Sequence, residues 1–341
     1  MRSRSVFWRV LIGCIIIGSV RMSVAQSKVG TTAAPFLGIS VGPRATAMGG
    51  AFAAVGNDAT ALYYNPGAIS RFGKSEFVFS QTDWLVNTRF NWIGMIYNMG
   101  EIGALGFSFT NLDYGEEEVT TVLQPEGTGE TWGATDFAAG ISYARNLTDR
   151  FSIGGTVKYI QMKVWNEKAS STALDIGLLF ITGFHDMRLG MSISNFGSDM
   201  RMEGKELLHR IDLDPNSVGH NETIVANLKT EKWPLPLFFR VGLAMDVVKL
   251  ASNRLTLAVD ALRPSDNTEI LNVGTELGIN EYVFLRVGYK SLFRDDSEEG
   301  LTAGAGINLA WGGAIGLSLD YTYADFGLFE DIQMISAGFR F

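Results

Sequence analysis

The chain has 341 residues and carries 28 Lys and Arg against 36 Asp and Glu, a formal net charge of −8. This acidic balance argues against nucleic acid as a partner, because binding to phosphates requires a basic surface. The 39 glycines, 8 prolines and 11% aromatic residues favour β structure. Cys14 is the one cysteine, which excludes disulfides and clusters of thiolate metal ligands.

Residues 1–25 have the three parts of a secretory signal peptide. The segment has a basic start, an apolar run over residues 10–20 and a cleavage-like "SVA" at 23–25. The apolar run is shorter than the roughly 20 residues that a helix needs to cross a bilayer. "LIGC" (11–14) also resembles a lipoprotein processing site, but the apolar stretch continues past Cys14, which favours cleavage after residue 25. Cleavage would remove four arginines and no acid, leaving a net charge of 24 − 36 = −12.

Residues 26–72 form a block that does not have the pattern of a strand. Its centre, "PRATAMGGAFAAVGNDATALYYNPGAIS" (43–70), has too much Gly and Ala for a stable isolated helix. Small side chains let a backbone lie close to a surrounding wall, which the rest of the chain supplies. We therefore predict that this block is a plug with short helical turns.

Within the block, Asn65-Pro66-Gly67 is predicted to be a turn that directs the chain from the plug into the first strand. Pro66 has no N–H and biases Asn65 toward an extended conformation, while Gly67 tolerates positive φ. The candidates for plugging or gating the lumen are Arg44, Asn57, Asp58, Asn65, Pro66 and Gly67. The candidates for facing an apolar ligand are Phe52, Leu62, Tyr63 and Tyr64.

Residues 73–341 alternate apolar and polar side chains in fourteen segments, which predicts antiparallel β-strands. The segments start near residues 74, 89, 101, 131, 150, 171, 186, 234, 253, 268, 282, 298, 313 and 330. One face carries large apolar residues, and the other carries Gly, Ala, Ser and Thr with isolated charges. Those charges are Lys158, Asp175, Arg240, Asp246, Asp260, Glu276, Arg286 and Asp320. A soluble sandwich would expose long charged side chains, whereas a barrel in lipid is apolar outside and polar inside.

The predicted connections alternate between short and long. Short ones include "NMGE" (98–101), "NLTD" (146–149) and "GG" (312–313), while long ones include 112–130, 165–170 and 197–233. Outer-membrane barrels have short periplasmic turns and long external loops, with both chain ends in the periplasm. The fold class is therefore all-β, a 14-stranded antiparallel transmembrane β-barrel with an N-terminal plug in the lumen.

The last segment, "MISAGFRF" (334–341), alternates up to a terminal aromatic residue. Phe339 and Phe341 resemble the signal by which bacterial outer-membrane barrels are recognised for assembly. We therefore expect the barrel-assembly machinery and outer-membrane lipid among the partners.

The N-terminal block resembles a known family. The Arg-Ala-x-Ala-Met-Gly-Gly-Ala run, the Asn-Asp step and the Asn-Pro-(Ala/Gly) turn after an aromatic residue are similar to the signature of the PorV/PorQ outer-membrane proteins. The match is close over residues 36–72, although Gly67-Ala68 stands where relatives read Ala-Gly. These proteins are distant relatives of the FadL-type fatty-acid transporters, which are fourteen-stranded barrels with an N-terminal hatch.

The resemblance implies one function and leaves a second open. The first is type IX protein secretion, in which the barrel receives secreted cargo through the loops 112–130 and 197–233 and works with other secretion components. The second is FadL-like transport of hydrophobic small molecules through a gated lumen. A purely structural barrel is a third reading of the sequence. The expected location is the bacterial outer membrane.

Motifs for other chemistry are weak, so we expect no enzyme, no cofactor and no metal. "GAISRFGKS" (67–75) has the wrong spacing for a phosphate loop and precedes a strand instead of a helix. His185, His209 and His220 fall in predicted turns and loops, without tight metal-ligand spacing. "GEEEV" (115–119) lacks the interleaved spacing of a calcium loop, and Trp233 is expected to be an interfacial aromatic.

Overall fold

The computed structural model describes residues 28–211, 224–250, 252–294, 297–311, 315–329 and 331–341. The predicted signal peptide and Cys14 lie outside the described residues, as does His220. Among the described residues, no helix combines the length and the apolar character that crossing a membrane requires.

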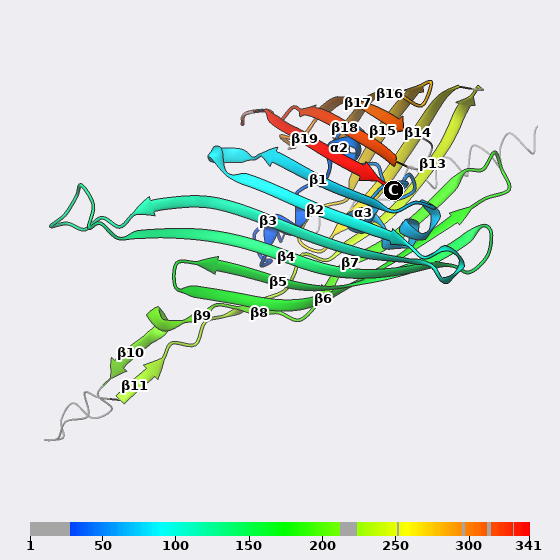
Figure 1. Cartoon of the computed structure of the whole chain (residues 1–341). Coiled ribbons are helices and arrows are strands. Elements are labelled where there is room, and N and C mark those ends of the chain that lie inside the picture. The colour runs from blue at the N-terminus through cyan, green and yellow to red at the C-terminus, as the bar shows by residue number, and fades with distance from the viewer. Residues whose placement is uncertain (1–27, 212–223, 251, 295–296, 312–314, 330) are drawn as a thin grey trace, which may run out of the picture.

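Fourteen long strands close into one antiparallel barrel (Figure 1). Each strand pairs with its neighbours along the chain, and β1 pairs with β19 from Glu76↔Arg340 to Asp83↔Gln333, which closes the sheet. The strands are β1 Glu76–Asp83, β2 Arg89–Asn98, β3 Ala104–Glu118, β4 Thr131–Asn146, β5 Phe151–Val164, β6 Glu167–Ile181, β7 Arg188–Gly197, β13 Phe238–Lys249, β14 Asn253–Pro264, β15 Ile270–Ile279, β16 Val283–Leu292, β17 Leu301–Trp311, β18 Ile315–Ala324 and β19 Ile332–Arg340. The predicted fourteen-stranded barrel is confirmed.

The two faces of the strands differ as the alternation predicted. In β13, Phe239 and Leu243 are exposed on the outside while Arg240 and Gly242 are buried on the inside. Large apolar side chains cover the outer face of the other strands in the same way. An apolar outer face needs lipid as its solvent, and the inner face then has to satisfy its polar groups within the barrel.

Residues 28–72, which we call the luminal segment, start at one mouth of the barrel and lie mostly inside it (Figure 1). Its short helical turns are η1 Pro35–Gly38, α2 Pro43–Ala47, α3 Ala61–Tyr64 and η2 Pro66–Arg71. The segment is mostly buried, with α2 against β16, β17 and β18, and η2 against β4, β5 and β6. The helical turns arise from local sequence, because Pro43 and Pro66 occupy first-turn positions that need no N–H donor.

The connections define two ends of the barrel. At the short-turn end they are 99–103, 147–150, 182–187, 250–252, 280–282 and 312–314, and at the long-loop end 84–88, 119–130, 165–166, 198–237, 265–269, 293–300 and 325–331. The structure corrects two predicted connections. Residues 165–166 form a tight turn instead of a loop over 165–170, and β3 runs to Glu118, so that the loop predicted at 112–130 starts at residue 119.

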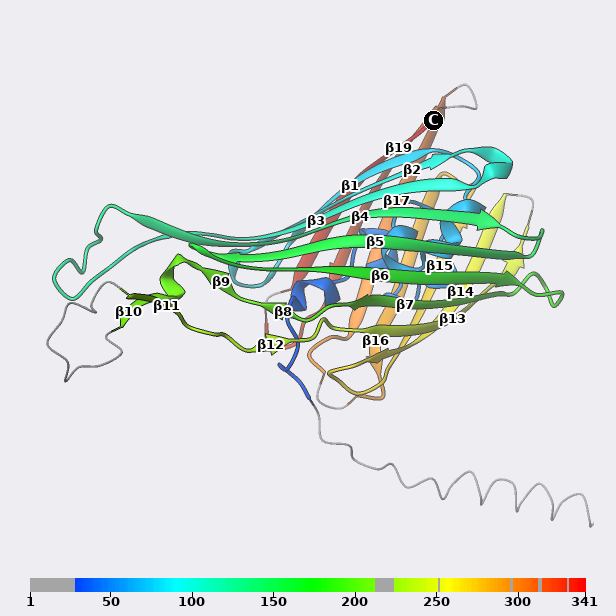
Figure 2. The same ribbon diagram turned by 90° about the horizontal axis from the view of Figure 1, so that it is seen from below.

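The connection 198–237, which we call the long arm, contains secondary structure in its described residues, 198–211 and 224–237. It contains β8 Met200–Arg201, β9 Glu203–Gly204, η5 Lys205–Leu207, β10 Leu208–Ile211, β11 Ile224–Asn227 and β12 Lys232–Trp233. β10 pairs with β11, β8 with β12, and β9 with the start of β6. The β10–β11 hairpin and the tip of the β3–β4 hairpin extend well beyond the other strands at the long-loop end (Figures 1 and 2).

Short 3-10 turns complete the connections. They are η3 Leu85–Asn87 between β1 and β2, and η4 Gly100–Ile102 between β2 and β3. At the chain end, Phe341 exchanges two backbone hydrogen bonds with Ser75, with N···O distances of 3.0 and 3.3 Å. Phe339 points outward from β19, and its ring stacks on that of Phe341 at 5.9 Å between centroids. The predicted assembly signal is thus an exposed aromatic pair where the barrel closes.

Candidate functional site: the interface between luminal segment and barrel wall

Arg44 is the main polar contact between the luminal segment and the wall. It lies in α2, and its guanidinium binds Glu276 of β15 through Nε and Nη2, at 2.7 and 2.8 Å from the two carboxylate oxygens. The remaining nitrogen, Nη1, donates to Asn57 at 2.6 Å and Asp58 at 2.8 Å. A two-pronged contact of this kind fixes orientation as well as distance. Three of the predicted plug residues therefore meet at one point.

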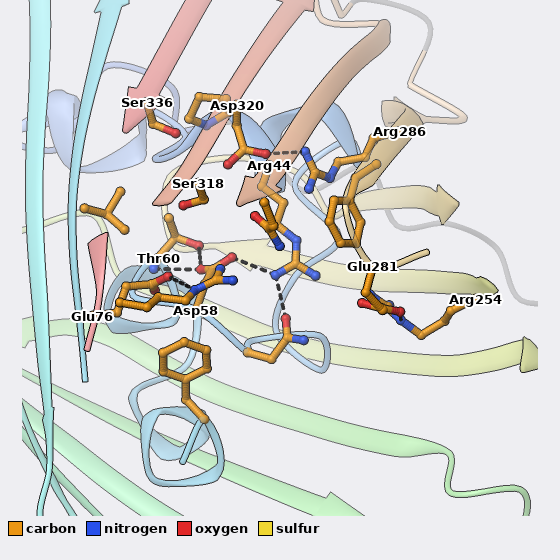
Figure 3. A pocket seen from close by; sticks show the side chains of 17 residues that line it. Arg44, Asp58, Thr60, Glu76, Arg254, Glu281, Arg286, Ser318, Asp320 and Ser336 are labelled. Carbon is orange, nitrogen blue, oxygen red and sulfur yellow. Dashed lines mark hydrogen bonds and ion pairs between the residues drawn. The ribbon is translucent and has the colours of Figure 1, made fainter. Parts of the chain in front are cut away.

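The carboxylate of Glu276 is shared by three arginines of three different elements. Figure 3 shows these arginines, Arg44, Arg254 and Arg286, around the neighbouring cavity. Besides the contact with Arg44, the Glu276 carboxylate accepts a hydrogen bond from Nε of Arg286 on β16 at 2.7 Å. It also lies 3.1 Å from Nη2 of Arg254 on β14. Arg286 in turn donates through Nη1 to Asp320 of β18 at 2.6 Å. The three buried carboxylates, counting Asp58, thus match the three arginines in number, and Arg254 also lies 3.4 Å from the exposed Glu281. Burial of unpaired charges would be costly, so each member stabilises the placement of the others.

A polar cavity of about 140 Å³ lies beside this network toward the short-turn end (Figure 3). Its lining includes Arg254, Glu281, Asp320 and Arg340. A space of this size and polarity suits several water molecules. The cavity is bounded on one side by the luminal segment at Arg44 and Asp58, so this segment separates it from the remainder of the lumen.

Other wall carboxylates bind backbone N–H groups of the luminal segment. Asp260 of β14 accepts hydrogen bonds from the N–H groups of Phe52 and Ala53 at 2.9 and 2.8 Å. Glu76, at the start of β1, accepts the N–H of Ala59 at 2.6 Å. These carboxylates satisfy donors that the irregular backbone leaves free, which buried backbone requires.

The Asn65-Pro66-Gly67 turn is held against β6. Asn65 is extended, with φ −159°, as predicted from the following proline, and its side chain accepts the N–H of Gly67 at 3.1 Å. Its Nδ2 donates to the carbonyls of Ala53 at 2.7 Å and Leu178 at 2.9 Å. The turn begins the 3-10 helix η2 instead of leading directly into β1, which corrects the prediction.

The reason for glycine at position 67 also differs from the prediction. Gly67 is not among the residues with positive φ. Its hydrogen faces the backbone of β6, where a methyl group would lie 2.9 Å from the nitrogen of Leu178 and closer still to Gly177. Close approach, not backbone conformation, therefore requires glycine here.

A belt of inward-facing wall glycines receives the luminal segment. A side chain at any of them would collide with residues 47–54 or 65–67. They are Gly154 (β5), Gly177 (β6), Gly190 (β7), Gly242 (β13), Gly274 (β15), Gly288 (β16) and Gly304 (β17). The small residues of the segment thus pack closely against the wall glycines on seven of the fourteen strands.

The predicted ligand-facing residues are mostly interior side chains of the luminal segment. Phe52, Leu62 and Tyr64 are buried, and the hydroxyls of Tyr63 and Tyr64 donate to the carbonyls of Leu37 and Val41 at 2.9 and 3.1 Å. The guanidinium carbon of Arg240 lies 5.2 Å from the ring centroid of Tyr63.

A small cavity is lined by two of these residues. Leu62 and Tyr63 face Phe90, Trp92 and Lys158 of the wall across about 30 Å³. Lys158 forms an ion pair with Asp175 at 2.8 Å at this place. The space is far below the 300 to 1,000 Å³ typical of small-molecule pockets.

The partners of Arg44 do not follow from the sequence. The alternation predicts Glu276, Arg286 and Asp320 on the inner face but does not join them to the luminal segment. One signal was available in the sequence. Isolated charges on the inner face of the strands need partners, and Arg44 is a charged residue among the small residues 43–56.

The histidine prediction was partly wrong. His209 lies on β10, not in a loop, whereas His185 lies in the turn between β6 and β7 as expected. The part of the chain that the structure describes contains no group of three or more His, Cys, Asp and Glu placed to hold a metal ion.

Comparison with known proteins gives both a family and a fold. The family described as type IX secretion system protein PorV matches residues 22–206. No curated protein matches the sequence.

Solved structures similar to this chain are outer-membrane channels. The CymD monoaromatic hydrocarbon channel has a TM-score of 0.53 and 10% identity over 88% of this chain and 96% of that one. The Pseudomonas putida toluene transporter TodX has a TM-score of 0.51 and 13% identity over 87% and 96%. A Pseudomonas aeruginosa FadL homologue has a TM-score of 0.48 and 10% identity over 88% and 96%. At such identities, the likeness to CymD and TodX concerns the fold.

Proposed function

The chain belongs to the PorV family of type IX secretion system proteins, and from this membership we propose that its long arm receives secreted proteins at the bacterial outer membrane. The protein is an outer-membrane β-barrel of the type IX secretion system. The finer proposal concerns where secreted cargo binds and which part of the molecule takes no part in that binding.

The lumen is an unsuitable route for a polypeptide. The luminal segment is held by the Arg44 network and by the glycine belt, and the cavities that it lines measure about 140, 30 and 20 Å³. A polypeptide would have to displace this buried, charge-paired contact. We therefore assign the luminal segment, and the predicted plug of residues 26–72 as a whole, the role of closing the barrel.

The long arm has the properties of a docking surface. The β10–β11 hairpin is a two-stranded ribbon whose outer edges are unpaired among the described residues, and Leu208, Ile211, Ile224 and Val225 are exposed on it. Free strand edges bind extended segments through main-chain hydrogen bonds, with side chains adding specificity. This ribbon is the single observation that carries the proposal. The role requires no catalytic residue.

Deletion of residues 208–227 tests this function in cells. We expect surface-attached secreted proteins to fall about tenfold, since losing roughly 1.4 kcal/mol of binding free energy costs a factor of ten. Tyr63→Phe, which removes one hydrogen bond in the lumen, serves as the control and should leave secretion unchanged. An unchanged set of surface proteins in the deletion strain, with normal amounts of barrel, would refute the proposal.

A second candidate function is transport of hydrophobic small molecules. It is supported by the fold, which CymD and TodX share, and by the cavity at Leu62 and Tyr63. That cavity would have to enlarge about tenfold to reach the usual size of a ligand pocket. Saturable binding of a fluorescent fatty acid that is lost in Tyr63→Ala would favour transport, and absence of binding to the purified protein would count against it.

A further inference from the structure

The start of the luminal segment lies at the long-loop end of the barrel. The N–H of Ala33 donates to the carbonyl of Pro234, next to β12, at 2.9 Å. Oγ1 of Thr32 donates to Asp266, in the connection between β14 and β15, at 2.8 Å. Lys28 and Val29, which precede these contacts, are exposed. Figure 2 shows this blue end of the segment beside β12.

The other end of the segment lies at the short-turn end. Ser70 donates to Asn146 at 2.9 Å, and Arg71 donates to the carbonyl oxygens of Thr148 and Asp149 at 2.8 and 2.6 Å. These partners belong to the end of β4 and its short turn to β5. From here the chain enters β1, whose first residue pairs with Arg340 near the chain end.

Contacts between these ends follow the length of the barrel. In chain order, Ser40 lies 3.2 Å from Nζ of Lys290, near the long-loop end of β16, and Arg44 reaches Glu276 nearer the short turns. Gly49 lies near the long-loop end again, where its N–H donates to Thr302 of β17 at 3.1 Å. Ala59 then contacts Glu76 near the short turns. The segment folds back on itself locally, but its two ends remain at opposite mouths.

We propose that the luminal segment threads the closed barrel from the outside to the periplasm, so that Lys28–Gly30 are presented on the cell surface at the base of the long arm. Long connections of outer-membrane barrels face outward and short ones face the periplasm, which gives the direction. This inference concerns topology and does not depend on the proposed docking function.

Threading limits how the segment moves. A plug that enters from the periplasm can leave the barrel as one body on the same side. A segment anchored at both mouths can leave only if its outer end is drawn through the filled lumen. A partner bound to the long arm near Pro234 would also touch the start of the segment, because Ala33 contacts Pro234 there. Ala33 lies 11 residues before Arg44 in the chain. Binding of a partner outside the barrel is thereby linked, through residues 33–44 of the chain, to the ion pairs of Arg44.

Cysteine labelling of intact cells tests the threading directly. The full-length protein carries Cys14→Ser, and Lys28→Cys, Glu126→Cys or Glu101→Cys is added singly. All three positions are exposed, and they lie respectively at the segment start, in the β3–β4 loop at the long-loop end, and in the turn η4 at the short-turn end. A membrane-impermeant maleimide is applied before and after the outer membrane is permeabilised.

We expect Lys28→Cys to be labelled in intact cells to the same extent as Glu126→Cys, with Glu101→Cys labelled only after permeabilisation. Labelling of Lys28→Cys together with Glu101→Cys would overturn threading. The two loop controls determine the orientation of the barrel independently. A reversed barrel would therefore be recognised by its controls, and threading would still require positions 28 and 126 to behave alike.

Discussion

At the scale of single residues, Arg44 determines how the luminal segment is held. It makes four hydrogen bonds to three side chains, and one of these partners, Glu276, is 232 residues away in the sequence. Removing one partner of a buried ion pair leaves the others uncompensated, which costs more than the pair itself contributes. Mutation of this residue is therefore the sharpest probe of the interface.

Arg44→Met should destabilise the barrel by about 3–5 kcal/mol, the usual cost of breaking a buried ion pair. The measurement is the temperature at which purified protein loses its folded mobility in detergent electrophoresis. Arg263→Met is the matched control, because the Arg263–Glu269 pair is exposed and such pairs contribute about 0–1 kcal/mol. Equal shifts in the two variants would contradict a structural role of the Arg44 network.

Gly177→Ala tests the fit between the segment and the wall. The added methyl would lie 2.7 Å from the nitrogen of Gly67 and closer to the side chain of Asn65, so we expect the segment to loosen. Proteolysis of purified protein within residues 28–72 should become faster. Gly316→Ala is the control, since its methyl would meet neighbours at 3.5 Å or more, an ordinary contact distance. Indistinguishable cleavage rates would mean that the glycine belt tolerates side chains.

The sequence predicted the kinds of residue in the site better than their partners. Alternation placed Glu276, Arg286 and Asp320 on the inner face because a period of two separates the faces of a strand. The pairing with Arg44 could not be predicted, since it depends on the register of distant strands and on the path of the luminal segment. For the same reason Gly67 was assigned to backbone conformation and not to contact with Gly177.

At the scale of elements, the barrel strands were predicted with starts close to the observed ones. Two boundaries failed for local reasons. The 165–166 turn contains Trp165 at φ 52° without a Gly or Pro to mark it, and the acidic end of β3 is exposed on both faces, so alternation disappears there. The β10–β11 hairpin was missed because every described residue in it is at least partly exposed and none shows a buried face.

The β10–β11 hairpin should be dispensable for the barrel. Its strands pair with each other, and the main sheet reaches the long arm through β9 instead. We expect deletion of residues 208–227 to change the unfolding free energy by no more than roughly 0.5 kcal/mol, as for surface changes away from the core. The readout is again the temperature of the mobility change in detergent electrophoresis. A large drop would mean that the arm supports the barrel and would confound its use in secretion tests.

At the scale of the whole molecule, the fold separates a closed barrel from an exposed arm. The lumen is filled by a segment of the same chain, while apolar side chains are exposed at the tips of the hairpins, as in Val122 at 100% and Val225 at 58%. The exposed apolar residues of the β10–β11 hairpin support our proposal that this surface binds a partner. The family belongs to a protein secretion system, and we therefore propose secreted protein as the partner.

The most direct test is to place a photo-crosslinking amino acid at Val225 on the arm or at Tyr63 in the lumen and to expose secreting cells to light. Mass spectrometry then identifies the crosslinked proteins. We expect secreted cargo to be captured from position 225 and not from position 63, with Phe107 on the lipid-facing wall as the background control. Cargo captured from position 63, with position 225 no higher than the wall, would contradict it.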